Sequence, residues 1–168
     1  LRARHVEVQI IGDGTGAIAV LGERECTLQR RHQKLIEIAP SPFLHKDVRE
    51  KLHAAARTLA QVLRYKGLGT FEFLVDARSD VANAAVAFIE ANARLQVEHT
   101  VTEAIYDLDL VALQFRIASG ATLAELGLAG EWRERVPDAA LPIDERAIAI
   151  EGERRKVGEP HRILGKLR

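Results

Sequence analysis

Hydrophobic and polar residues alternate with a period of two near the start of the chain. Val6, Val8 and Ile10 alternate with polar neighbours, which is the period of a half-buried strand. A glycine-rich segment at 12–16 follows, and then a second apolar strand candidate at 17–23. No helical pattern follows the glycines, as a dinucleotide-binding loop would require. They are therefore expected to form the turn of a β-hairpin.

A helical period begins after the loop marked by Pro40 and Pro42. Apolar residues recur at helical spacing from Lys46 to Tyr65, which predicts a helix that buries one face. Asp47 favours the positive end of that helix, and Gly67 is expected to end it.

Two strands and a second helix are predicted further along the chain. The segments 69–75 and 86–92 have strand character, and a helix is expected from about Asp107 to Gly120, with one more strand candidate at 147–150. Strands paired as hairpins with helices between them predict an α+β fold, in which an antiparallel sheet has its helices packed on one face.

Five polar residues occupy every second position after the apolar run that ends at Ile89. They are Glu90, Asn92, Arg94, Gln96 and Glu98. In an extended chain all five would lie on one side. A solvated surface is the simpler explanation for any one of them, but the ordered series of acid, amide, base, amide and acid favours a binding site.

The two predicted strands at 69–75 and 86–92 each carry a glutamate among apolar residues. Pairing Glu72 with Glu90 puts Asp76 opposite Val86 and places both carboxylates on one face. Like charges at such positions repel each other unless a cation lies between them. Oxygen ligands suit Mg²⁺, and Asn92 adds a carbonyl oxygen on the same side.

The remaining polar residues suit an anion. The guanidinium of Arg94 matches a small oxyanion, and Glu98 is a candidate general base. The segment QRRHQK at 29–34 is a nucleic-acid patch, a solvated edge or an anion site. Beside the metal-binding acids, the anion site suits phosphoryl transfer, in which catalysis is mostly positioning and neutralisation of charge.

Composition limits the partners. The 168 residues are 47% hydrophobic and 29% charged, with 24 Lys and Arg against 24 Asp and Glu. Zero net charge gives no support to a nucleic-acid partner, and no segment has the length or the pattern of a membrane span or a signal peptide. Cys26 is the single cysteine, so a cytoplasmic setting is expected. Because the chain begins at Leu1 and has no Met, we expect a piece of a longer polypeptide.

Four motifs together resemble a known family. They are RHVEVQIIGDGTG, ERECTLQRRHQKLIEIAPSP, GTFEFLV and FIEANARLQVEHTVTE, and in this order they resemble the biotin carboxylase domain of biotin-dependent carboxylases, which belongs to the ATP-grasp superfamily. The likeness runs from about Arg4 to about Leu128. It implies a partial ATP-grasp domain over 1–128 and a divergent, weakly structured segment over 129–168.

The resemblance implies an activity and a set of site residues. In the family, ATP phosphorylates bicarbonate to carboxyphosphate, and the released CO₂ carboxylates the biotin of a carrier protein. The implied residues are His5, Gln29, His32, Leu74 and Glu90 for ATP; Glu72, Glu90 and Asn92 for Mg²⁺ or Mn²⁺; and Lys34, Arg94, Gln96 and Val97 for bicarbonate. Glu98 would be the base, with Arg94 and Lys34 also catalytic. A biotin carboxyl carrier, a carboxyltransferase and an oligomeric parent enzyme are implied as well.

Departures from the family pattern leave alternatives open. The family's N-terminal domain and glycine-rich lid are absent, so the isolated chain is expected to be inactive. Glu151 or Glu153 stands where the family has a biotin-contacting arginine. A second interpretation is a degenerate, non-catalytic ATP-grasp remnant that acts as a binding or assembly module. A third is an ATP-grasp ligase with another acceptor, such as a carbamoyl-phosphate or amino-acid ligase, against which the RRHQK and RLQVEH segments argue.

Overall fold

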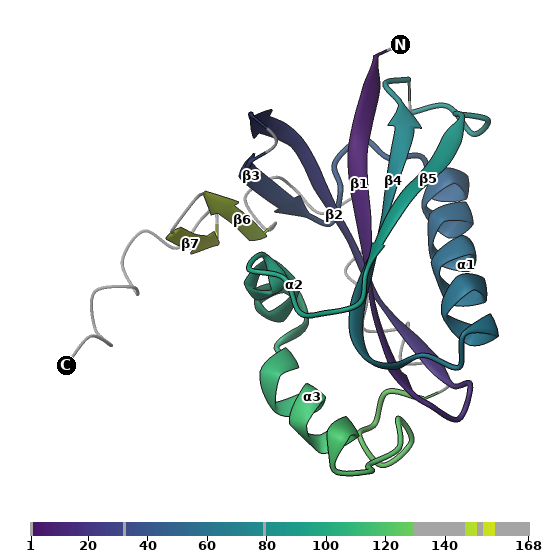
Figure 1. Ribbon diagram of the computed structural model, residues 1–168. Coiled ribbons are helices and arrows are strands. Elements are labelled where there is room, and N and C mark those ends of the chain that lie inside the picture. Colours follow the sequence, from purple (N-terminus) through teal and green to yellow (C-terminus); the bar gives the residue numbers. More distant parts are fainter. Residues whose placement is uncertain (1, 32, 79, 130–146, 151–152, 157–168) are drawn as a thin grey trace.

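The computed structural model describes residues 2–31, 33–78, 80–129, 147–150 and 153–156 (Figure 1). Within these ranges the strands are β1 (Ala3–Asp13), β2 (Ile18–Arg30), β3 (Gln33–Ala39), β4 (Lys66–Asp76), β5 (Val86–Asn92), β6 (Ala147–Ile150) and β7 (Glu153–Lys156). The helices are α1 (Lys46–Val62), α2 (His99–Tyr106) and α3 (Leu110–Ala118). None of these helices is long and apolar enough to cross a lipid bilayer.

All the strands belong to one antiparallel sheet with the order β5-β4-β1-β2-β3-β6-β7. β1 and β2 form the expected hairpin, and Gly14 (φ 86°) and Gly16 (φ 105°) lie in its turn with the positive φ that glycine allows. The predicted α+β class and antiparallel sheet are confirmed. The strand expected at 147–150 is β6, which pairs with β3. The predicted division of the chain at residue 128 stays a prediction.

The helices cover both faces of the sheet rather than the one face that the sequence predicted. On one face, α1 buries Val48, Leu52, Ala56 and Ala60 against the side of β1 that carries Val6, Val8 and Ile10. On the other face, α3 buries Leu110, Leu113 and Ile117 against Ile11, Leu21 and Leu68. Consecutive apolar residues such as Ile10 and Ile11 point to opposite faces of a strand, so each face needs a covering helix.

The same two-sided cover corrects the expectation that β1 is half-buried. Glu7 and Gln9, which alternate with the apolar residues of β1, are 0% and 1% exposed. Their face of the sheet lies under α2, whose Thr102 is also buried. β1 therefore carries buried polar side chains in the middle of the sheet, and these need partners there.

The second predicted helix corresponds to α3, which begins at Leu110 rather than at Asp107. Asp107, the expected start of that helix, instead ends α2 in the left-handed conformation, with φ 52° and ψ 47°. The N-cap of α3 is Asp109, whose side chain accepts a hydrogen bond from the Ala112 backbone nitrogen at 2.7 Å. α2 was not predicted from the sequence.

Candidate active site

The two glutamates of the β4–β5 hairpin lie opposite each other, as predicted. Glu72 pairs with Glu90, and Asn92 Nδ2 donates to Glu72 Oε1 at 2.9 Å and to Glu90 Oε1 at 3.2 Å. A bulge after Glu72 shifts the rest of the pairing, so Val86 lies opposite Val75 instead of Asp76. The bulge falls beyond the acids and leaves all three polar side chains on one face.

The chain leaves the strand after Asn92, which corrects the expectation of an extended segment up to Glu98. Gln96 nevertheless returns to the site. Its Nε2 donates to Glu72 Oε1 at 3.3 Å, and its Oε1 accepts from the hydroxyl of Thr70. Glu98 stands directly before α2, at its N-cap position. Burial of Val101 and Thr102 holds the start of α2 in this place.

Lys34 on β3 connects these elements. Its Nζ donates to Glu7 Oε2 at 2.5 Å and to Glu98 Oε1, and it lies 3.5 Å from Glu72 Oε1. Burial opposes the charge of Lys34, but the negative charge of Glu7 and the hydrogen bonds to Glu7 and Glu98 together raise the lysine pKa. Burial likewise opposes ionisation of Glu98, while its hydrogen bond from Lys34 lowers the pKa of the carboxyl. Both groups are therefore charged at neutral pH.

His5 and Gln29 also meet Glu72, from β1 and β2. Gln29 Nε2 donates to His5 Nδ1 at 2.6 Å and to the Cys26 carbonyl at 2.8 Å. His5 Nε2 in turn donates to Glu72 Oε2 at 2.5 Å. Burial disfavours the Glu72 carboxylate, yet the His5 hydrogen bond and the charge of Lys34 lower its pKa to about 2. Glu72 is thus an ionised carboxylate on the sheet face.

Three buried residues of the site were missed from the sequence. Arg24 is 0% exposed; its Nε donates to Glu7 Oε1 at 2.6 Å, and its Nη1 donates to Gln9 Oε1 at 3.0 Å and to Thr102 Oγ1 at 2.7 Å. Glu7, Arg24 and Thr102 form a layer beneath Lys34. Charged and amide residues within otherwise apolar strands, as in EVQ and GERE, were the available signal.

Glu37 on β3 is the fourth residue that the sequence did not single out. It is 5% exposed, and its two carboxyl oxygens have no hydrogen-bond partner among the residues that the structure describes. One of its oxygens lies within 4.8 Å of a Glu7 oxygen and of the Cys26 sulfur. Burial, followed by repulsion from Glu7 and Glu98, raises the pKa of Glu37 to about 8. Glu37 is therefore mostly protonated at neutral pH.

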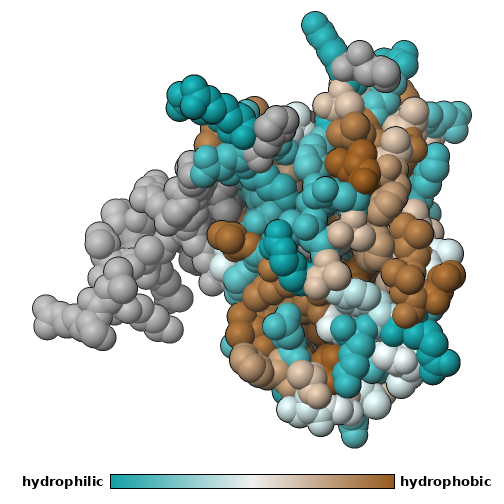
Figure 2. Space-filling view, viewed as in Figure 1, coloured by the Kyte–Doolittle hydropathy of each residue, from teal (hydrophilic) through white to brown (hydrophobic). Residues whose placement is uncertain are grey.

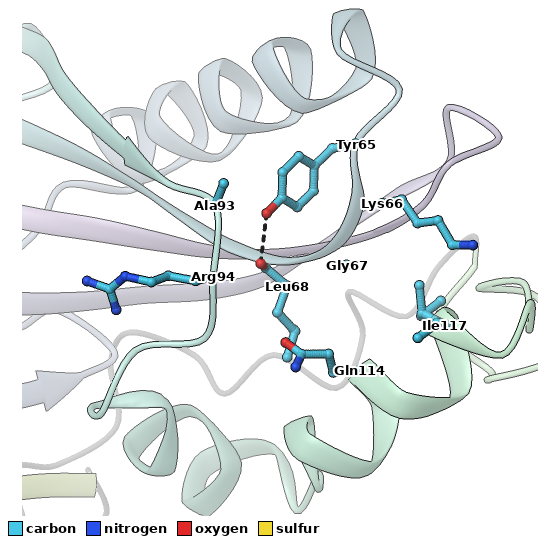
Figure 3. A pocket seen from close by; sticks show the side chains of 9 residues that line it. Tyr65, Lys66, Gly67, Leu68, Ala93, Arg94, Gln114 and Ile117 are labelled. Carbon is cyan, nitrogen blue, oxygen red and sulfur yellow. Dashed lines mark hydrogen bonds between the residues drawn. The ribbon is translucent and has the colours of Figure 1, made fainter.

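The other predicted residues lie at the edge of this cluster. Leu74 is 39% exposed and Val97 is 89% exposed, while His32 lies outside the described residues. Arg94 donates to the neighbouring Leu95 carbonyl at 3.3 Å, and within the described chain it forms no ion pair with Glu72 or Glu90. Figure 3 shows its side chain pointing away from Tyr65 and Lys66, with which it lines a cavity of about 440 Å³ beside α3.

The surface reflects this separation of polar and apolar groups. In Figure 2 hydrophilic side chains gather over the middle of the face, and a hydrophobic strip runs beside them along β5. Ile89 is an exposed apolar residue of that strand, and Leu74 is one of β4. A polar, charged centre bordered by an apolar edge fits a ligand with an ionic part and an apolar ring.

A divalent cation fits the acidic end of the site. Glu72, Glu90 and Asn92 present oxygen atoms from adjacent strands, and Asn92 touches both carboxylates. Oxygen donors of this kind suit Mg²⁺ or Mn²⁺. Because Asn92 now donates through its nitrogen, its amide would turn to offer the carbonyl oxygen.

Comparison with known proteins identifies the family of this chain. The family described as "Carbamoyl-phosphate synthase L chain, ATP binding domain" matches residues 1–126. Pyruvate carboxylase 1 of Caenorhabditis elegans is 54% identical over 130 residues, which are 77% of this chain and 11% of that protein. The biotin carboxylase domain of a single-chain bacterial carboxylase has 51% identity and a TM-score of 0.74, over 88% of this chain and 32% of that one.

A third relative was solved with ligands. The biotin carboxylase domain of the 2-oxoglutarate carboxylase from Hydrogenobacter thermophilus, in complex with MgADP, ADP and bicarbonate, is 37% identical with a TM-score of 0.70, over 87% of this chain and 29% of that one.

The chain belongs to the family of carbamoyl-phosphate synthase L chain ATP-binding domains. The resemblance to biotin carboxylase domains within this family is confirmed. The chain spans about a tenth of the pyruvate carboxylases that it matches and about a third of the solved biotin carboxylase domains.

Glu37 makes the stability of the fold depend on pH. The pKa of Glu37 rises from 4.5 to about 8 in the folded chain, so the folded state binds more protons than the unfolded state between these values. The contribution of Glu37 to the stability of the folded state is therefore complete below pH 4.5 and is lost as the pH rises through about 8. We expect Glu37→Gln to flatten the fall in the free energy of unfolding between pH 6 and pH 9. Urea denaturation at each pH measures the free energy of unfolding.

The matched control is Glu50→Gln on the exposed side of α1, which should leave the pH dependence as it is in the unchanged protein. Parallel curves for Glu37→Gln and the unchanged protein would show that Glu37 is ionised throughout.

Proposed function

We propose that this chain supplies the metal-binding and bicarbonate-binding part of a biotin carboxylase. The observation that carries the proposal is the convergence of Lys34, Glu72 and Glu98 on one face of the sheet, next to Glu90 and Asn92. In this function ATP phosphorylates bicarbonate to carboxyphosphate, and the CO₂ that it releases is passed to biotin on a carrier protein.

The nucleotide and its metal ion belong at the hairpin. Glu72, Glu90 and Asn92 would hold Mg²⁺ or Mn²⁺, which neutralises the phosphate charges when it is bound. His5 and Gln29 form a hydrogen-bonded pair beside Glu72 and would face the nucleotide together with Leu74 and His32. The Hydrogenobacter thermophilus domain, solved in complex with MgADP, supports the binding of a nucleotide and its metal ion by a domain of this kind.

Bicarbonate would bind beside the hydrogen-bonded pair of Lys34 and Glu98. The Lys34 ammonium and the Gln96 amide can donate to an anion, as can the exposed backbone at Val97. Glu98 accepts a hydrogen bond from Lys34 and is ionised, so it is a competent general base once the anion lies within reach. Arg94 is exposed and can turn its guanidinium toward the same anion.

The whole reaction needs parts that this chain does not contain. The chain covers 32% of a solved biotin carboxylase domain, and we propose that the remainder closes over the nucleotide. The partners would be a biotin carboxyl carrier, as protein or domain, and a carboxyltransferase, in an oligomeric parent enzyme. The 168 residues alone should therefore bind metal but show little or no turnover.

Metal binding tests the hairpin directly. Glu90→Gln replaces one ligand carboxylate at an exposed position and leaves the buried hydrogen bonds of Glu72 intact. We expect it to weaken Mn²⁺ binding about tenfold or more, because a carboxylate is lost from a site with few protein ligands. Electron paramagnetic resonance of free Mn²⁺ measures the affinity. The control is Glu50→Gln, which should bind as the unchanged chain does; equal affinities for Glu90→Gln and the control would exclude this metal site.

Catalysis is tested by complementation. The N-terminal portion of a homologous biotin carboxylase, which carries the lid, is supplied in trans with ATP, Mg²⁺, free biotin and this chain. We expect ATP hydrolysis that depends on bicarbonate and falls at least about a hundredfold in Glu98→Gln, since a positioned base contributes on this scale. Substantial turnover by the chain alone would contradict the proposed division of labour. Absence of rescue would favour the non-catalytic binding module.

A further inference from the structure

We propose that Arg24 is a positioning residue that aligns Lys34 with Glu98 through two separate hydrogen-bond paths. Arg24 contacts neither of these residues and is 0% exposed, so it acts only through the side chains that it holds. The inference rests on the proposed function, in which Lys34 and Glu98 act on the same anion.

The first path runs through Glu7. Arg24 Nε donates to Glu7 Oε1 at 2.6 Å, and Lys34 Nζ donates to Glu7 Oε2 at 2.5 Å. Glu7 is 0% exposed, so its two oxygens have only protein groups around them. With one oxygen fixed by Arg24, the other is aimed at β3 and sets the position of the lysine ammonium. The lysine then donates onward to Glu98 Oε1.

The second path runs through α2. Arg24 Nη1 donates to Thr102 Oγ1 at 2.7 Å. Thr102 lies one turn into α2, and the backbone nitrogen of Val101 donates to the Glu98 carbonyl at 3.0 Å. A side chain that fixes Thr102 therefore fixes the start of the helix and the residue that precedes it. The two paths meet at the hydrogen bond between Lys34 and Glu98.

The same guanidinium also reaches the hairpin that carries the acids. Arg24 Nη1 donates to Gln9 Oε1 at 3.0 Å, and Gln9 Nε2 donates to the Gly69 carbonyl of β4 at 3.0 Å. Glu72 lies on this strand three residues further along. Arg24 thus links β1, β4 and α2, the elements that carry the acids, as well as β3 through Lys34.

Arginine is required because one planar group must donate in several fixed directions. A lysine at position 24 keeps the positive charge for Glu7 but has one nitrogen, and it cannot serve Glu7, Gln9 and Thr102 in the same geometry. Charge alone would be satisfied by either residue. If Arg24 only compensates the charge of Glu7, Arg24→Lys should behave as the unchanged chain does. If Arg24 positions Lys34 and Glu98, Arg24→Lys should disturb their arrangement.

The experiment uses the 168-residue chain without nucleotide. Arg24→Lys and Thr102→Val are compared by two measurements: amide hydrogen exchange in the first turn of α2, and carbon-13 NMR titration of the Glu98 side-chain carboxyl. Glu98 faces Lys34 and Glu37 from β3 and Arg24 from β2. In both variants we expect the amide hydrogens in the first turn of α2 to exchange at least about tenfold faster than in the unchanged chain. We also expect the carboxyl to titrate about one unit higher in both variants, because it loses contact with the lysine.

The control is Arg49→Lys. Arg49 holds another buried carboxylate of β2, with its Nη1 2.5 Å from Glu23 Oε1, but it does so on the α1 face of the sheet. This variant should lose global stability, yet leave the Glu98 titration and the first turn of α2 unchanged. Equal changes in the control and in Arg24→Lys would overturn the proposal, because they would reflect general loosening.

The proposal would also be overturned if Arg24→Lys and Thr102→Val both left the amide exchange of α2 and the titration of Glu98 unchanged. If Arg24→Lys does not fold, Thr102→Val decides alone, because it keeps the Arg24–Glu7 ion pair. Neither measurement uses turnover. A chain that shows these changes but fails to complement catalysis would refute the proposed function and retain the positioning role of Arg24.

Discussion

A carboxylate in the middle of the sheet determines where the site residues lie. Glu7 is 0% exposed and lies between two cations, Arg24 and Lys34. An unpaired charge in this environment would destabilise the fold by several kcal/mol, so both cations are held against it. Lys34 is drawn from β3 onto the sheet face for this reason, and its remaining donors are directed at Glu98 and Glu72. The lysine that we propose to bind bicarbonate is thus placed by a structural requirement.

Under the proposed function, the balance of charge around Lys34 would let one site attract both a metal and an anion. Glu7, Glu72 and Glu98 are three carboxylates, and Arg24 and Lys34 supply two positive charges. The excess negative charge lies toward the hairpin, where Glu90 adds to it, and it favours a divalent cation there. The hydrogen-bond donors that could bind an anion are those of Lys34 and Gln96. Glu37 holds its proton at neutral pH, so it adds no further repulsion to this arrangement.

Site residues could be predicted from the sequence where their contacts are local, and could not where the contacts join distant parts of the chain. The pairing of Glu72 with Glu90 depends on a hairpin and a period of two, so it could be predicted. The positions of Gln96 and Glu98 were predicted on the correct side for an incorrect reason, since an irregular segment and α2 replace the extended strand that the alternation indicated. The irregular segment and α2 form there because Val101 and Thr102 become buried against the sheet. The spacing of residues along the local sequence does not reveal this burial.

The buried layer was hidden from a sequence reading because a polar residue in an alternating strand indicates solvent. Glu7 and Gln9 follow that pattern, and Arg24 stands in a run of charged residues, yet α2 covers all three from a segment more than seventy positions further along the chain. The helices on both faces were missed for a similar reason. Only the adjacent apolar residues of β1 and β2, such as Ile10 with Ile11, could have indicated that the second face is covered.

The central claim is that Glu72 and Glu90 converge on one divalent cation. Crystals of the chain grown with Mn²⁺ and an ATP analogue, and measured at the manganese absorption edge, test it most directly. The account predicts an anomalous peak between the two carboxylates, at a distance of about 2 Å from oxygen atoms of both. A peak elsewhere on the sheet, or carboxylates that remain bound only to Asn92 and His5, would contradict it.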